Sequence, residues 1–294
     1  PPPPPPPPPA LFFLMIRRPP RSSHCISSAS SDVYKRQEKI DCINQFVDIK
    51  KFHLDRIKSL FDIDYISKRL KKMKLRIFVD SMHGSAANCM AEIFASNDLE
   101  VISEIRKDAD PFFGGKPPEP LLNYADDLKQ TLMKNSTNEV KTLGIIFDGD
   151  GDRIAAIDEK GRYSSTQDLL PYFISYLGEI KNNSYPVLKT VSGSDIIKNI
   201  SESQNRDVFE LPVGFKYIAE KMIKEKIFIG GEESGGVGFG DFMPERDALY
   251  AAMVLLNGIA EKSQYLYETL DAVSYTHLRA HETSLHLVCR LLLE

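Results

Sequence analysis

Short runs rich in β-branched and aromatic residues alternate with segments of helical periodicity from about Leu75 onward. This alternation is typical of an α/β layer fold, in which helices cover the faces of sheets. A chain of 294 residues is long enough for about two domains of ordinary size. The sequence therefore predicts two consecutive α/β domains with mixed sheets flanked by helices.

The first predicted unit covers residues 75–162. Apolar residues recur at helical spacing from Leu121 to Leu132, after the proline-rich stretch KPPEP, and predict an amphipathic helix. The predicted strands of this unit are 75–79, 100–105, 143–147 and 154–157.

The second predicted unit, residues 163–273, begins after the turn DEKGR and resembles the first in the order of its elements. Ser194 stands where the N-cap of a helix is expected. Residues 38–74, upstream of both units, are predicted to be mostly helical and charged. In the second unit the predicted helices lie around 169–177, 196–200, 215–223 and 249–259, and the predicted strands are 186–191 and 227–229.

The two ends of the chain differ from the middle. Residues 1–37 begin with nine prolines and show no periodicity that would bury one face. One interpretation is a proline-rich linker or a ligand for an SH3-like domain. The stretches SDVYKRQ and, near the other end, SYTHLRAHETS look instead like translated sequencing-adapter sequence. We therefore predict that 1–37 and 274–294 are non-native or disordered tails.

Composition argues against several classes of protein. Without the two tails, the chain has 30 basic and 38 acidic residues, and this net charge of −8 leaves no basic stripe for nucleic acid. The most apolar short run, residues 11–16, is far below the about 20 residues that cross a bilayer. The four cysteines form no CxxC pair and no zinc pattern. We expect a cytoplasmic protein with neither nucleic acid nor membrane as a partner.

The stretch FDGDGDR, residues 147–153, places three aspartates at alternate positions directly after a predicted strand. Carboxylates this close raise one another's pKa unless a cation or hydrogen bonds compensate. The carboxyl end of a buried strand is also where ligand sites form in open α/β sheets. We predict that Asp148, Asp150 and Asp152 bind Mg²⁺, with phosphate or water completing its shell. Arg153 is placed to stabilise charge on a phosphoryl group.

This loop has two other interpretations. Aspartates at positions one, three and five and Glu159 at position twelve fit part of an EF-hand. However, position six must be glycine and is Arg153, and the preceding segment is predicted to be a strand rather than a helix. The second alternative is a solvated acidic turn without a ligand.

The loop DGDGDR resembles the metal loop of the α-D-phosphohexomutases, the phosphoglucomutase and phosphomannomutase superfamily. Three further motifs agree with this family in the same order, namely VDSMHG (79–84), PVGFKYI (212–218) and GGEESGG (230–236). The resemblance spans about 75–273. It implies that 75–162 is the family's second domain with the metal loop, that 163–273 is its third domain with a sugar-binding loop, and that 38–74 is the end of a truncated first domain.

The resemblance also implies roles for individual residues. Glu232 and Ser234 are implied to contact the sugar hydroxyls that distinguish hexoses, with Gly231 in the same loop. Lys189 matches a basic position near sugar and phosphate, and Lys216 lies in the preceding motif. Both lysines can alternatively be ordinary surface side chains.

Several conspicuous residues are expected to be structural. His83 stands beside a glycine at a turn between strand and helix, where a hydrogen-bonding role is expected. The stretch FFGGKPPEP, residues 112–120, is expected to form a shaped turn. Arg246 and Asp247 are expected to cap the last predicted helix.

The resemblance implies an isomerase. An enzyme phosphoserine, with Mg²⁺, would move a phosphoryl group between C1 and C6 of a hexose phosphate, and the EESGG loop favours glucose or mannose over glucosamine phosphates. No TASHNP-like serine loop and no RxSGTEP-like phosphate loop occurs in this sequence. We therefore expect binding of hexose 1-phosphate or 6-phosphate without mutase turnover. The alternatives are a metal-dependent phosphatase and a non-catalytic phosphosugar-binding or Ca²⁺-binding module.

Overall fold

The computed structural model describes residues 48–95, 101–181 and 183–273. Contacts divide the chain into residues 1–52 and residues 53–294. Of the first unit only residues 48–52, at the start of a helix, are described, and both predicted tails lie outside the described residues. No helix in the described part of the chain has the length and hydropathy that crossing a membrane requires.

The first sheet has five strands in the order β2-β1-β3-β4-β5. Strand β1 is parallel to both β2 and β3, whereas β4 is antiparallel to β3 and β5 is antiparallel to β4. The mixed sheet is therefore confirmed, and the strand β5 was not predicted because it has only two residues. The strands are β1 (Leu75–Asp80), β2 (Ile102–Ile105), β3 (Lys141–Phe147), β4 (Ile154–Ile157) and β5 (Tyr163–Ser164).

The second sheet repeats this arrangement in the order β7-β6-β8-β9. Strand β6 is parallel to β7 and β8, and β9 is antiparallel to β8. The predicted strand 227–229 begins two residues too early, because the ladder of β8 with β6 begins at Ile229, which pairs with Val187. The strands are β6 (Val187–Thr190), β7 (Val208–Leu211), β8 (Ile229–Gly231) and β9 (Val237–Phe239).

The helices agree with most of the predicted positions. The helix predicted from Leu121 begins later, at Asp126, because Leu122–Tyr124 forms a 3-10 turn after the proline-rich stretch. The helices are α2 (Ile49–Lys58), α3 (Ile63–Lys72), α4 (Cys89–Phe94), α5 (Asp126–Asn135), α6 (Thr166–Ile180), α7 (Asp195–Ser203), α8 (Phe215–Lys224) and α9 (Ala248–Lys262).

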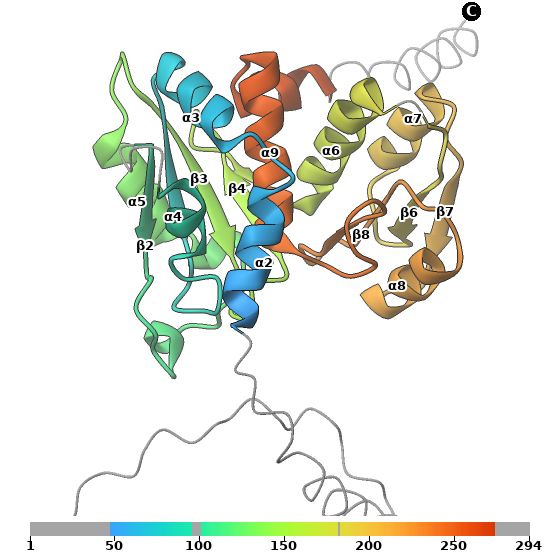
Figure 1. The fold of residues 1–294 in the computed structure, drawn as a ribbon, viewed down its shortest axis with the longest axis horizontal. Coiled ribbons are helices and arrows are strands. Elements are labelled where there is room, and N and C mark those ends of the chain that lie inside the picture. The colour runs from blue at the N-terminus through green and yellow to red at the C-terminus, as the bar shows by residue number, and fades with distance from the viewer. Residues whose placement is uncertain (1–47, 96–100, 182, 274–294) are drawn as a thin grey trace, which may run out of the picture. The chain divides into compact units, whose positions relative to one another are not determined.

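Each sheet is covered by helices on both faces, because buried side chains alternate between the faces along each strand. In the first sheet, Val79 packs in the main core with α3 and α9, whereas Phe78 packs with α5 on the other face. In the second sheet, Val187 belongs to the same main core, whereas Leu188 packs against α8. Figure 1 shows α9 between the first sheet and α6. The two α/β layers therefore share one central core.

Side chains cap the starts of several helices, among them α6, α7 and α9. Ser194 accepts the Ile196 amide at 3.2 Å, which confirms the predicted N-cap of α7. Ser165 and Asp168 form a capping box at the start of α6. Asp247 accepts the Tyr250 amide at 2.8 Å and is the N-cap of α9, as expected.

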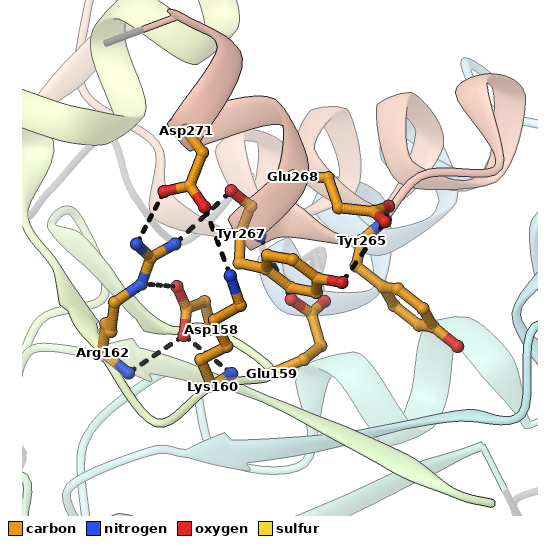
Figure 2. A network of polar contacts seen from close by, with 8 residues as sticks. All are labelled: Asp158, Glu159, Lys160, Arg162, Tyr265, Tyr267, Glu268 and Asp271. Carbon is orange, nitrogen blue, oxygen red and sulfur yellow. Dashed lines mark hydrogen bonds and ion pairs between the residues drawn. The ribbon is translucent and has the colours of Figure 1, made fainter. Parts of the chain in front are cut away.

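The turn after β4 is joined to the segment after α9 by a polar network (Figure 2). The Asp158 carboxylate accepts the Nε of Arg162 at 2.6 Å, and the Nη1 of Arg162 donates to Asp271 at 2.6 Å. The Nζ of Lys160 also lies 3.3 Å from Asp271. Two basic side chains of this turn therefore hold the same acidic residue.

Glu159 lies in the middle of this network. Its carboxylate accepts the backbone amides of Leu266 and Tyr267 at 3.1 and 3.2 Å. These amides lie at the start of a further helical segment, so Glu159 satisfies donors that the helix itself leaves unpaired. Burial raises the pKa of Glu159 to about 7, although the amide hydrogen bonds oppose this shift.

Candidate functional site

The three predicted metal ligands lie together in the loop between β3 and β4. One carboxylate oxygen from each of Asp148, Asp150 and Asp152 lies within 4.8 Å of the others. Asp148 is buried, Asp150 is exposed and Asp152 is half-buried. The folded loop therefore offers three oxygen ligands at a place that solvent can reach.

Asp148 organises this loop. Its Oδ1 accepts hydrogen bonds from the backbone amides of Gly151, Asp152 and Arg153, at 3.0, 3.0 and 3.1 Å. Its Oδ2 accepts a hydrogen bond from the Nε of Arg153 at 2.5 Å. Burial alone would raise the pKa of Asp148, but the hydrogen bonds and charge of Arg153 outweigh it and lower the pKa. Asp148 is therefore held as a carboxylate.

The other two carboxylates are less well compensated. Burial, and then the charge of Asp148, raise the pKa of Asp152 to about 7 and raise that of Asp150 as well. This repulsion between close carboxylates is what a bound divalent cation would relieve. Oxygen ligands with open access fit the hard cation Mg²⁺, which keeps part of its shell for water or phosphate.

Two segments singled out in the sequence, residues 79–84 and 112–120, lie next to backbone that contacts the metal loop at Gly149. A Cβ at Gly84 would lie 2.5 Å from the Gly149 carbonyl oxygen, so the two backbones touch. The Ser85 amide donates to that same carbonyl at 2.9 Å, and the Gly149 amide donates to the Pro118 carbonyl at 2.9 Å. The motif 79–84 and the turn 112–120 are therefore structural supports of this loop.

His83 makes the kind of contacts expected of a structural residue. Its amide donates to the Arg106 carbonyl at 2.7 Å, and its Nδ1 lies 2.7 Å from the Asp108 carbonyl oxygen. Its φ of 60° lies in the left-handed region, which marks a tight turn.

The predicted sugar loop connects β8 to β9. Gly231 ends β8, where a Cβ would lie 2.8 Å from a methyl group of Leu170. Glu232 is 8 % exposed, and its Oε1 accepts Nη1 of Arg246 at 3.0 Å. The buried Oγ of Ser234 has no hydrogen-bond partner among the described residues.

The metal loop and the sugar loop lie side by side. The Ile154 amide donates to the Gly235 carbonyl at 3.0 Å, and Arg153 forms an isolated β-bridge with Gly236. Gly235 has φ 116°, and a Cβ there would lie 2.9 Å from the Cβ of Arg153. Only glycine fits this close approach without strain.

Arg246 contacts both loops. Its Nη2 lies 2.6 Å from Asp152 and its Nη1 lies 3.0 Å from Glu232. The prediction that Arg246 caps α9 was wrong: the neighbouring Asp247 is the cap, and the Arg246 side chain points to the loops. Sequence reasoning missed this role, because nothing near Arg246 in the sequence indicates it.

The two predicted lysines lie elsewhere. Lys189 is 1 % exposed, and its Nζ lies 3.0 Å from both the Gly193 carbonyl and the Glu210 carboxylate. Lys216 is exposed, and its Nζ lies 4.8 Å from the centre of the Tyr217 ring. Among the polar contacts of the described residues, none joins either lysine to the two loops.

Comparison with protein families gives two adjacent matches. Residues 51–161 match the phosphoglucomutase/phosphomannomutase alpha/beta/alpha domain II, and residues 167–275 match domain III of the same family. The domain boundaries proposed from the sequence remain predictions.

Individual relatives agree with this assignment. A phosphoglucosamine mutase of Methanocaldococcus jannaschii is 32% identical over 210 residues, which are 70% of this chain and 46% of that protein. Phosphoglucomutase 1 of Drosophila melanogaster is 27% identical over 226 residues, or 75% of this chain and 39% of that protein. The chain thus spans less than half the length of these relatives.

Solved structures show the same fold. The crystal structure of a candidate phosphomannomutase from Thermus thermophilus has a TM-score of 0.69 at 26% sequence identity, and the match covers 78% of this chain and 51% of that one. With two consecutive domain matches to one family, this chain belongs to the phosphoglucomutase/phosphomannomutase family of the α-D-phosphohexomutase superfamily.

Proposed function

We propose that residues 48–273 form the metal-binding and sugar-binding part of a phosphohexomutase. Such an enzyme moves a phosphoryl group between C1 and C6 of a hexose phosphate, here of glucose or mannose. The observation that carries this proposal is the direct contact between the acidic loop and the sugar loop, through backbone pairing and through Arg246. A cation site and a sugar site must be adjacent for phosphate transfer to a sugar hydroxyl.

The metal loop has the first role. Asp148, Asp150 and Asp152 would hold Mg²⁺, which when bound neutralises negative charge on phosphoryl oxygens. Asp148 keeps Arg153 beside the site through its 2.5 Å contact. Arg153 then offers its remaining guanidinium donors to the transferred group.

The sugar loop has the second role. Glu232 and Ser234 would read sugar hydroxyls, and Gly231 allows the chain to turn closely at the end of β8. Lys189 and Lys216 are proposed to contact the substrate phosphate, for which Lys189 must leave its ion pair with Glu210. Residues 48–273 are assigned no phosphoserine and no site for a second phosphate. We therefore expect these residues to bind the sugar phosphate without turnover, in a cytoplasmic setting.

Titration calorimetry on the full chain tests the proposal. We expect Mg²⁺ to bind in preference to Ca²⁺, and glucose 1-phosphate or mannose 1-phosphate to bind when Mg²⁺ is present. Glu232→Ala should abolish sugar-phosphate binding and leave Mg²⁺ binding intact, and Asp150→Asn should weaken Mg²⁺ binding.

Three results would count against the proposal. Release of inorganic phosphate from the sugar phosphate would favour a metal-dependent phosphatase. A clear preference for Ca²⁺ without sugar binding would favour a calcium module. Conversion of glucose 1-phosphate to glucose 6-phosphate would refute the expected lack of turnover.

A further inference from the structure

A pocket of about 310 Å³ lies beside the sugar loop. The residues that line it include Pro120, Leu121, Tyr163, Thr166 and Ser234. Its walls therefore come from the turn before α5, the start of α6 and the loop after β8. This volume is within the usual range for small-molecule sites.

Two hydroxyl groups of this pocket stand out. The Oγ1 of Thr166 and the Oγ of Ser234 are buried and have no hydrogen-bond partner among the described residues. Thr166 is only 2 % exposed. Neighbouring hydroxyls are paired: that of Tyr163 donates to the Pro120 carbonyl at 2.5 Å, and that of Ser165 lies 3.3 Å from Asp168. Since buried polar groups are nearly always hydrogen-bonded, two exceptions among the residues that line one pocket point to a missing partner.

The helix does not require the hydroxyl of Thr166. Thr166 is the first residue of α6, and the preceding Ser165 already supplies the N-cap. The first helical position accepts many residues, including proline, because its amide has no partner within the helix. Secondary structure therefore does not explain a buried hydroxyl at this position.

The charges around the pocket indicate what kind of group enters it. No lysine or arginine is among the described residues that line it, and the lining residue Glu233 is exposed. A phosphate would meet a carboxylate without a compensating cation. Apolar walls of Pro120, Leu121 and Tyr163 together with two free hydroxyls suit a neutral sugar ring, whose CH face packs on apolar surface and whose hydroxyls need partners.

We propose that Thr166 is an additional specificity-determining residue of the sugar site. Its Oγ1 and the Oγ of Ser234 bind neighbouring hydroxyls of the hexose ring, and the phosphate group stays outside the pocket. This inference rests on the proposed function, because Ser234 belongs to the proposed sugar loop.

The decisive variant is Thr166→Val, which removes the hydroxyl and keeps the shape. Calorimetry with Mg²⁺ present should show glucose 1-phosphate binding about three- to tenfold more weakly than to the unchanged chain. Thr166→Ser, which keeps a hydroxyl, should restore most of the affinity. Thr131→Val on α5 is the matched control, since the Thr131 hydroxyl is already paired with the Asp127 carbonyl at 2.8 Å, and it should bind as the unchanged chain does.

Deoxy sugars separate recognition from a structural effect. Among 2-, 3- and 4-deoxyglucose 1-phosphate, one analogue should bind the unchanged chain more weakly than glucose 1-phosphate, yet bind Thr166→Val and the unchanged chain equally. If every analogue loses the same affinity in both proteins, or if Thr166→Val binds glucose 1-phosphate normally, the inference is wrong while the proposed function stands. If the unchanged chain binds no sugar phosphate, both are wrong.

Discussion

The metal loop and the sugar loop occupy the same place in two copies of one arrangement. Each connects the third strand of a sheet to an antiparallel fourth strand, β3 to β4 in the first and β8 to β9 in the second. The scaffold is repeated, and the residues in the loops differ. Under our proposal, the shared topology carries an acidic cation site in one copy and a site for neutral sugar hydroxyls in the other.

The two loops are also held differently. The metal loop is organised from within, because the Asp148 carboxylate accepts three of the loop's own amides. The sugar loop instead has two internal backbone hydrogen bonds, from the Glu232 amide to the Gly236 carbonyl at 3.0 Å and from the Gly235 amide to the Glu232 carbonyl at 3.4 Å, and its Gly235 and Gly236 pair with Ile154 and Arg153 beside the metal loop. Substitutions that disrupt the metal loop should therefore also disturb the sugar loop. Substitutions in the sugar loop should leave the metal loop largely intact.

The largest effect is expected from Asp148→Ala. The change leaves three amides and the Arg153 guanidinium without their buried partner, which should cost about 3–5 kcal/mol in the free energy of unfolding. Urea denaturation and calorimetry should show lower stability and loss of both metal and sugar binding. Asp150→Ala is the control: it should lose metal affinity at nearly unchanged stability, because Asp150 is exposed. Sugar binding that survives in Asp148→Ala would contradict the dependence of one loop on the other.

The turns that follow the two antiparallel strands can be compared in the same way, since each supplies an acidic cap, Glu159 after β4 and Asp247 after β9. The pKa of Glu159 is raised to about 7 in the folded chain, against about 4.3 when unfolded. The folded state therefore binds the Glu159 proton more tightly than the unfolded state does. The contribution of this group to the free energy of unfolding is fully present below about pH 4 and is lost as the pH rises from about 4 to about 7.

Glu159→Gln should remove this pH dependence, which amounts to at most about 4 kcal/mol. Urea unfolding of both proteins at several pH values between 4 and 8 measures it. Glu268→Gln, which changes an exposed carboxylate in the same network, is the control (Figure 2). Identical pH profiles for Glu159→Gln and the unchanged chain would show that Glu159 is not the titrating group.

A smaller effect is expected from Gly235→Ala in the sugar loop. The added Cβ meets Arg153 at 2.9 Å and adopts a φ that non-glycine residues avoid, so stability should fall by about 1–3 kcal/mol. Sugar affinity should fall while metal affinity stays within about a factor of three, or about 0.6 kcal/mol. Gly161→Ala separates the two causes, because it has φ 79° in open space. Equal losses of metal and sugar affinity would show that the coupling also runs in the reverse direction.

The smallest effect concerns Arg246, which contacts both loops. Arg246→Met removes a positive charge that lies 2.6 Å from Asp152, so Mg²⁺ should bind about tenfold more tightly, or about 1.4 kcal/mol. Calorimetry at constant ionic strength checks this, with Lys216→Met as a control for loss of one exposed positive charge. Unchanged Mg²⁺ affinity in Arg246→Met would mean that the guanidinium does not oppose the metal.

Much of the fold could be predicted because its signals are local. Contiguous β-rich runs located β1, β3, β4 and β6, and the helical spacing of apolar residues located α6 to α9. The strands β7 and β9 were missed because VFEL is partly exposed and VGF contains a glycine, so neither shows a clear strand pattern. The three aspartates were found because they lie within five consecutive residues and need no folding to be neighbours.

By itself, the sequence determined the fold class, the repeated order of elements and the acidic loop, since each is written in neighbouring residues. Only the tertiary structure decided that the sugar loop pairs with the metal loop, that Arg246 lies between Asp152 and Glu232, and that Thr166 and Ser234 share one pocket. These residues are separated by tens of positions along the chain. They meet because two sheets with the same topology pack on one core, and that packing is a property of the whole fold.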